Sequence, residues 1–75
     1  MAEDQDVERA RAAAATRELL RVMRAYRKDP GYASSALGQL RGAYVEAVDA
    51  GITPERIERL TGMSIVELED IVGPP

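Results

Sequence analysis

Apolar residues recur at spacings of three and four over most of this chain, and that period is typical of amphipathic α-helices. No segment shows the alternation of apolar and polar residues expected of a β-strand. Breaks that contain glycine or proline separate a long N-terminal segment, a middle segment and two short C-terminal segments. We therefore predict one small all-α domain over residues 1–75.

The first helix is predicted over residues 6–28, where the chain is rich in alanine, arginine and leucine and ends at the Asp29-Pro30-Gly31 break. Successive residues advance by about 100° around a helix, so its side chains separate into two sides. The apolar side holds Ala12, Ala15, Leu19, Val22, Met23 and Tyr26, and the basic side holds Arg17, Arg21, Arg24 and Lys28. Glu8 falls on the apolar side, so we expect residues 1–10 to fray or to be covered by another chain.

A second helix is predicted over residues 32–50, before Gly51, which offers a left-handed C-terminal cap. Its apolar positions, at helical spacing, are Ala33, Leu37, Leu40, Tyr44 and Val48. Gly38 and Gly42 lie one turn apart inside it, where each costs about 1 kcal/mol relative to alanine. The glycine pair indicates either a close helix crossing or simple tolerance.

Residues 53–72 carry the start and stop signals of two short helices joined by a tight turn, a helix-turn-helix pair. Thr53 is a typical N-cap before Pro54, and Gly62 permits the positive φ that a sharp turn needs. Ser64 begins the last helix, and Glu67 completes an S-x-x-E capping box. The apolar residues expected to share one centre are Ile57, Leu60, Met63, Leu68 and Ile71.

This stretch resembles the helix-turn-helix of bacterial DNA-binding proteins over about residues 51–72. The resemblance rests on Ile57, the turn Thr61-Gly62-Met63-Ser64, and the later Leu68 and Ile71. It implies that the last helix enters the major groove of DNA and contacts base edges. Glu58 departs from the family pattern, which usually has a small residue there, so it must tilt toward solvent or force the helices apart.

Charge is distributed unevenly along a chain whose net charge is −3. Residues 17–41 contain six basic and two acidic residues, whereas residues 49–75 contain six acidic and two basic ones. The basic side of the first helix is therefore the candidate phosphate-binding surface. Its members are Arg17, Arg21, Arg24, Arg27 and Lys28, with Arg41 near its edge. The alternative is a solvated face, or one paired with the acidic C-terminal third.

The outer face of the last helix is the candidate DNA- or partner-binding surface, and it comprises Ser64, Ile65, Val66, Glu69 and Asp70. Acidic side chains can accept hydrogen bonds from cytosine and aliphatic ones can contact a thymine methyl, but this helix offers no cation to phosphate. Two functions are therefore open. The chain is a small DNA-binding transcriptional regulator or accessory factor, or it is a protein-interaction module that binds a basic partner through this acidic and apolar helix.

The long first helix predicts a homodimer. It is roughly 35 Å long, more than the short helices can cover. Its apolar residues Ala12, Ala15, Leu19, Val22 and Tyr26 alternate spacings of three and four like a short coiled-coil seam. A dimer through this helix would suit a symmetric DNA site, and a monomeric bundle is the alternative.

The composition argues against an enzyme. The chain has no histidine, no cysteine and no glycine-rich phosphate loop, so we predict no catalytic residue and no cofactor. The carboxylates Glu67, Glu69 and Asp70 match no calcium loop, so no metal site is predicted. An acidic N-terminus and the lack of a long apolar run predict an unexported, cytoplasmic protein that does not bind membranes.

Overall fold

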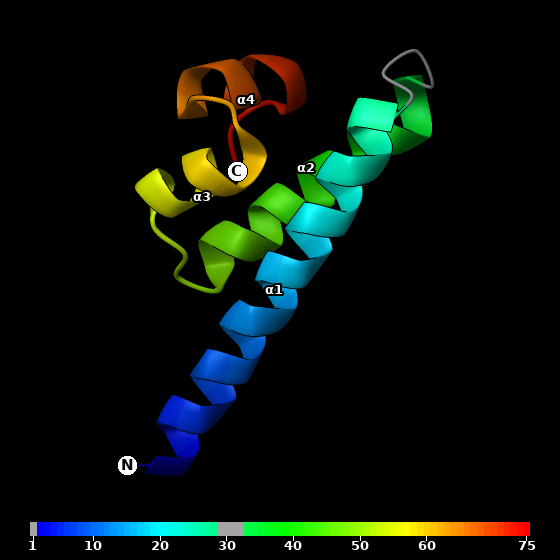
Figure 1. The fold of residues 1–75 in the computed structure, drawn as a ribbon. Coiled ribbons are helices and arrows are strands. Elements are labelled where there is room, and N and C mark those ends of the chain that lie inside the picture. Colours follow the sequence, from blue (N-terminus) through cyan, green and yellow to red (C-terminus); the bar gives the residue numbers. More distant parts are fainter. Residues whose placement is uncertain (1, 29–32) are drawn as a thin grey trace.

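The computed structural model of the chain describes residues 2–28 and 33–75, and it describes side chains for residues 5–28 and 37–75. Within these residues it has four helices and no strand, which confirms the predicted all-α fold with a long first helix. They are α1 (Ala2–Lys28), α2 (Ala33–Asp49), α3 (Pro54–Thr61) and α4 (Ile65–Val72) (Figure 1). None of these helices is both long and apolar enough to cross a membrane.

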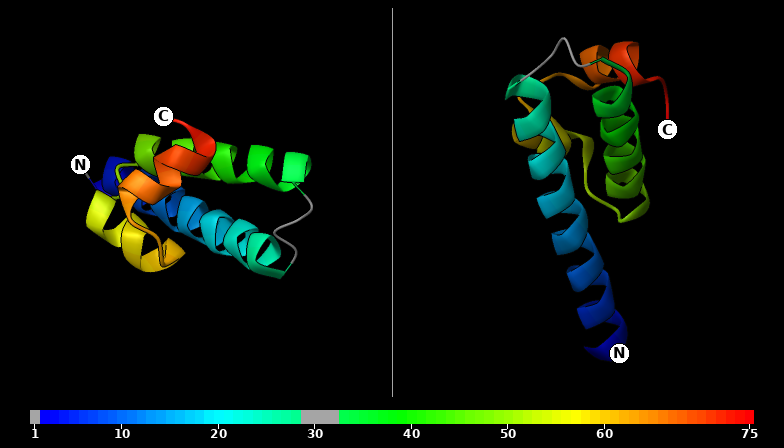
Figure 2. Two further views of the ribbon diagram at one scale, coloured as in Figure 1. Left: turned by 90° about the horizontal axis from the view of Figure 1, so that it is seen from above. Right: turned by 90° about the vertical axis from the view of Figure 1, so that its right-hand side faces the viewer.

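The two long helices lie side by side, and the two short helices pack on one flank of the pair. α3 packs against α1, α4 packs against α2, and α3 and α4 contact each other. The N-terminal turns of α1 extend beyond the other helices (Figure 2), so the molecule measures 45 × 20 × 18 Å.

The helix boundaries differ from the predicted ones mainly at the N-terminus. α1 begins at Ala2 rather than at Asp6, so residues 2–10 are helical in the structure, and the expected fraying of residues 1–10 stays a prediction. The sequence at this end is acidic, and acidic residues favour a helix N-terminus, where the helix dipole is positive, which accounts for the earlier start. α2 ends at Asp49, one residue before the predicted end. The predicted break at residues 29–31 and the predicted helix start at Tyr32 lie outside the described residues.

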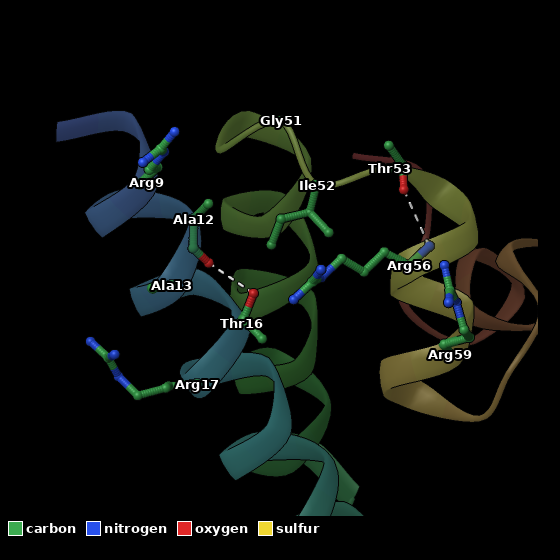
Figure 3. A pocket seen from close by; sticks show the side chains of 10 residues that line it. All are labelled: Arg9, Ala12, Ala13, Thr16, Arg17, Gly51, Ile52, Thr53, Arg56 and Arg59. Atoms are coloured by element: carbon green, nitrogen blue, oxygen red, sulfur yellow. Dashed lines mark hydrogen bonds between the residues drawn. The ribbon is translucent and has the colours of Figure 1, made fainter. Parts of the chain in front are cut away.

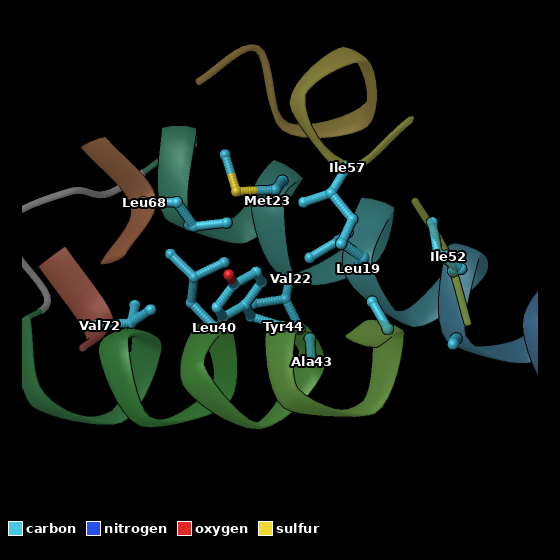
Figure 4. Close-up of a cluster of buried hydrophobic side chains, with 12 residues drawn as sticks. Leu19, Val22, Met23, Leu40, Ala43, Tyr44, Ile52, Ile57, Leu68 and Val72 are labelled. Atoms are coloured by element: carbon cyan, nitrogen blue, oxygen red, sulfur yellow. The ribbon is translucent and has the colours of Figure 1, made fainter. Parts of the chain in front are cut away.

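All four helices contribute to a single apolar core (Figure 4). Its buried members are Ala15, Leu19, Val22, Met23, Leu40, Ala43, Tyr44, Ala47, Ile52, Ile57, Leu68 and Val72. Two predicted core positions are wrong, because Ile71 and Val48 are each 38% exposed. Helix geometry explains both, because each lies at the edge of the buried side of its helix. Ile71 is about 100° around the helix from the buried Val72, and Val48 is about 100° from the buried Ala47.

The predicted dimer seam lies inside the chain. Ala15, Leu19 and Val22 are at most 6% exposed, and Ala12 and Tyr26 pack against the same core. α2 and α3 are the helices that pack against α1. A second copy could therefore use this seam only if these helices moved away.

Gly51 ends α2 as predicted. Its φ of 82° is left-handed, its N–H donates to the Val48 carbonyl at 3.0 Å, and the Ile52 N–H donates to the Ala47 carbonyl at 3.1 Å. This pair of hydrogen bonds is the Schellman motif. The motif also directs Ile52 into the core, where it is 9% exposed.

The predicted caps of the short helices are present. The Thr53 hydroxyl accepts from the Arg56 N–H at 3.3 Å, and Gly62 ends α3 with φ 72°. The Ser64 hydroxyl accepts from the Glu67 N–H at 3.1 Å. The capping box differs in one detail, because the Glu67 carboxylate accepts from the Ser64 hydroxyl, at 3.3 Å, instead of from the backbone.

Glu58 adds a second cap to α4. Its half-buried carboxylate accepts from the Ile65 N–H at 2.9 Å, and Ile65 is the first residue of α4. The N–H groups of a first helical turn lack partners within the helix and carry a partial positive charge, so they favour a carboxylate. The expectation that Glu58 must either point to solvent or force the helices apart is therefore wrong, because its carboxylate joins α3 to α4.

Two arginines tie the long helices to the C-terminal ends of the short ones. Arg27 of α1 donates to the Thr61 carbonyl at 2.6 Å, and Arg41 of α2 donates to the Val72 carbonyl at 2.6 Å. Thr61 and Val72 are the last residues of α3 and α4. The final carbonyls of a helix lack partners within the helix and attract cations. These contacts fix both short helices to the α1–α2 pair.

Gly38 and Gly42 do not mark a close helix crossing. Both are exposed, and a Cβ atom built at either position would meet nothing within 4 Å. We predict that Gly42→Ala raises the free energy of unfolding by about 1 kcal/mol, because alanine restricts the unfolded chain and favours helix. Urea unfolding followed by circular dichroism measures the change. A destabilised variant would mean that another surface packs closely on this glycine.

Replacing Glu58 should weaken the start of α4. We predict that Glu58→Ala lowers the free energy of unfolding by about 1 kcal/mol, the usual cost of losing a helix cap. Glu58→Gln should lose less, because its amide oxygen still accepts from the Ile65 N–H. The matched control is Glu46→Ala on the exposed surface of α2, which should be nearly neutral. Equal effects at both positions would contradict the capping role.

Candidate functional site

The most distinctive surface feature is an open groove of about 690 Å³ between α1 and the start of α3. Four arginines line it: Arg9 and Arg17 from α1, and Arg56 and Arg59 from α3. The remaining lining residues are small, apolar or uncharged, namely Ala12, Ala13, Thr16, Gly51, Ile52 and Thr53. We call this feature the arginine groove.

The local fold of each wall positions these arginines. Arg56 and Arg59 are exposed on α3, on the side away from the buried Ile57. Arg56 reaches from α3 into the space toward α1, next to Ile52 and Thr16, whereas Arg59 stays alongside α3 (Figure 3). The Thr16 hydroxyl donates to a carbonyl of its own helix, that of Ala12, at 2.8 Å. The groove therefore has a largely apolar floor with the Arg56 guanidinium above it, whereas the Arg17 side chain extends along its rim, away from α3 (Figure 3).

The arginine groove is electropositive although the whole chain is acidic. No aspartate or glutamate is among its lining residues. Within the side chains that the structure describes, the single ion pair is formed by Arg21 and Glu18, so all four groove arginines lack a carboxylate partner. A concave surface with one sign of charge concentrates counterions, and a guanidinium group can donate two parallel hydrogen bonds to a phosphate. The groove is thus suited to phosphate or another oxyanion.

The structure does not bring all five predicted phosphate-binding residues into the groove. Arg17 lines it, whereas Arg24 and Lys28 are exposed outside it, further along the same side of α1. Arg21 is paired with Glu18, and their hydrogen bond lowers the pKa of Glu18 and raises that of Arg21. The Arg27 guanidinium donates to the Thr61 carbonyl. Arg21 and Arg27 thus have partners within the chain.

Sequence reasoning missed Arg9, Arg56 and Arg59 as a site. The last two were counted within the acidic C-terminal third, where six carboxylates outnumber them. Their spacing of three did carry a signal, because it places them on one side of a helix. Which surface they would face depended on the docking of α3 on α1, which the sequence alone does not specify.

The predicted binding face of α4 is only partly exposed. Val66 is 80% exposed and Asp70 is also exposed, but Ser64, Ile65 and Glu69 are half-buried. Ser64 caps the helix and Ile65 packs against the core. The exposed face of α4 instead adds Glu67 and Ile71 to Val66 and Asp70. It is acidic and apolar, in contrast to the arginine groove.

The described residues give little support to a metal site or to a reactive tyrosine. No group of three or more acidic side chains there could hold a metal ion. Burial raises the pKa of the Tyr44 hydroxyl, and the negative charge of Glu69 adds to this effect. Tyr44 is only 3% exposed, so it serves the core as a neutral aromatic side chain.

Comparisons with known proteins leave the arginine groove as the main guide to function. No family model, curated protein or solved structure matches this chain.

Anion binding in the groove should stabilise the fold. We predict that pyrophosphate, at constant ionic strength, raises the melting temperature by several degrees, because a ligand at ten times its Kd stabilises by about 1.4 kcal/mol. The variant Arg56→Gln/Arg59→Gln should lose this effect. The control Arg21→Gln/Arg24→Gln removes the same charge outside the groove and should keep it. Equal shifts in both variants would contradict a local site.

Proposed function

We propose that this chain is a small DNA-binding protein that holds the phosphate backbone of a duplex in the arginine groove. The observation that carries the proposal is the set of four arginines, from α1 and α3, that line one concave surface without a lining carboxylate. Contacts between cations and phosphate supply most of the free energy of non-specific DNA binding. Clustered guanidinium groups therefore suit the phosphate backbone of a duplex.

The position of the groove agrees with the resemblance to helix-turn-helix proteins. In that family the first helix of the motif crosses the DNA backbone and the second enters the major groove. Here α3 corresponds to the first helix of the motif, and it carries Arg56 and Arg59 at its exposed surface. Backbone contact is thus the part of the family's binding mode that these residues support.

Base recognition by α4 has less support. Its exposed side chains include Val66, Glu67 and Asp70, and no residue of the helix is basic. Carboxylates in the major groove lie between two rows of phosphates, and the repulsion offsets the few hydrogen bonds that they can accept from cytosine. We therefore propose binding with little sequence preference, typical of an accessory factor more than of an operator-specific regulator.

A second candidate is a protein-interaction module that binds a basic partner through α4. The exposure of Val66, at 80%, favours it, because large apolar side chains at the centre of a charged face are typical of interfaces. The two candidates use different surfaces. Val66→Asp should abolish binding to such a partner and leave DNA binding by the groove unchanged.

We also keep the homodimer as a proposal, but it would have to form through a surface other than the predicted apolar seam of α1. The seam of α1 is buried, so a second copy would have to bind the outer face of this helix or another exposed face. Sedimentation equilibrium of the protein without DNA tests for the dimer, and a constant mass of 8.2 kDa would exclude it.

Fluorescence anisotropy of a labelled mixed-sequence duplex tests the proposed function. If four arginines each neutralise a phosphate, affinity should fall about 100-fold between roughly 50 and 200 mM salt. Arg56→Glu/Arg59→Glu should weaken binding at least tenfold more than the matched reversal Arg21→Glu/Arg24→Glu. Equal losses would place the contact outside the groove, and no binding at the lower salt would contradict the proposal.

A further inference from the structure

Two exposed faces of this molecule have opposite charge, and each contains an apolar side chain. On α4, Val66 and Asp70 form one row along the helix and Glu67 and Ile71 form the next, since residues four apart lie on the same side. Val66 is 80% exposed and Ile71 is 38% exposed. We call these four residues the acidic face.

The second face is on the exposed side of α1, next to the arginine groove, with which it shares Arg17. Leu20 is 40% exposed and lies between Arg17 and Arg24, which are three and four residues away on the same side of the helix. Lys28 continues the row one turn further. We call these four residues the basic face.

The exposure of these side chains means that neither face is fully covered within the chain. Leu20 and Val66 are among the few exposed large hydrophobic side chains of the described residues. Each has charged neighbours of a single sign, positive around Leu20 and negative around Val66. Such faces repel a copy of themselves but complement each other in charge and in apolar content.

We infer that the acidic face of one copy binds the basic face of a second copy. Val66 would pack against Leu20, and the carboxylates of Glu67 and Asp70 would lie beside Arg24 and Lys28. The distribution of charge along the sequence agrees with this pairing. Residues 17–41, which include the basic face, carry an excess of basic residues, and residues 49–75, which include the acidic face, carry an excess of acidic ones. This inference does not depend on the proposed DNA binding, and its test contains no DNA.

The contact joins two different surfaces, and this has consequences for assembly. Each copy in a pair retains one unused face, so copies can add in a head-to-tail series or close into a ring. A face of four side chains on an eight-residue helix is small, so we expect weak association, with a Kd on the order of 10–100 μM. Screening of the exposed charges should weaken it further at high salt.

Sedimentation equilibrium of the purified chain measures this association directly. The average mass should rise above 8.2 kDa with concentration at about 50 mM salt and return toward that value at about 500 mM. A mass that stays at the monomer value up to millimolar concentration would overturn the inference and leave the acidic face to a basic segment of another protein.

Variants with one altered face make the test specific. Leu20→Glu places a carboxylate in the basic face, and Val66→Asn/Asp70→Asn removes the apolar contact and one charge from the acidic face. Both should remain folded, because the altered side chains are exposed, and circular dichroism checks this. Each variant alone should associate at least tenfold more weakly than the unaltered chain. Arg24→Gln is a second, milder alteration of the basic face and should also weaken association.

An equimolar mixture of the two face variants gives the decisive result. Each variant retains the face that the other lacks, so the mixture should form a one-to-one dimer and nothing larger. Monomers in the mixture, or variants that associate like the unaltered chain, would overturn the pairing of these two faces.

Discussion

The structure depends on the docking of two short helices, α3 and α4, on the long pair α1 and α2. Helices of eight residues are not stable alone in water, because the conformational entropy lost in forming the first turn exceeds the stabilisation from so few hydrogen bonds. Ile57 and Leu68 therefore stabilise the fold by their burial in the shared core, at 1% and 0% exposure. Arg27 and Arg41 complete the docking at the helix ends, where carbonyl groups lack partners.

The docking also creates the site. Arg9 and Arg17 belong to the first helix and Arg56 and Arg59 to the third, and they line one groove only because α3 packs on α1. The mutual repulsion of four guanidinium groups opposes this arrangement, and the apolar contacts beneath them offset it. The same packing leaves the acidic face of α4 separate from the groove. Opposite charges thus collect on different surfaces of a chain with a small net charge.

Local features of the sequence predicted much of the fold. Thr53, Gly62 and Ser64 act through hydrogen bonds and backbone conformations within a few residues, so their roles could be read directly from the chain. The role of Glu58 could not be read in this way, because its carboxylate accepts a hydrogen bond from the backbone of the following helix, across the turn. The groove was missed for a related reason: averaging charge along the sequence hid Arg56 and Arg59 among neighbouring carboxylates. The seam of α1 was found correctly as apolar, but what covers it depended on tertiary packing.

The arginine groove as a phosphate-binding surface is the central claim, and NMR can test it residue by residue. A titration of the isotope-labelled protein with a short duplex should shift the side-chain Nε–H signals of Arg56 and Arg59 and the backbone amides of Thr16 and Ile52. Signals from α4, including that of Val66, should change little. Shifts confined to α4, or no shifts at low salt, would contradict the claim.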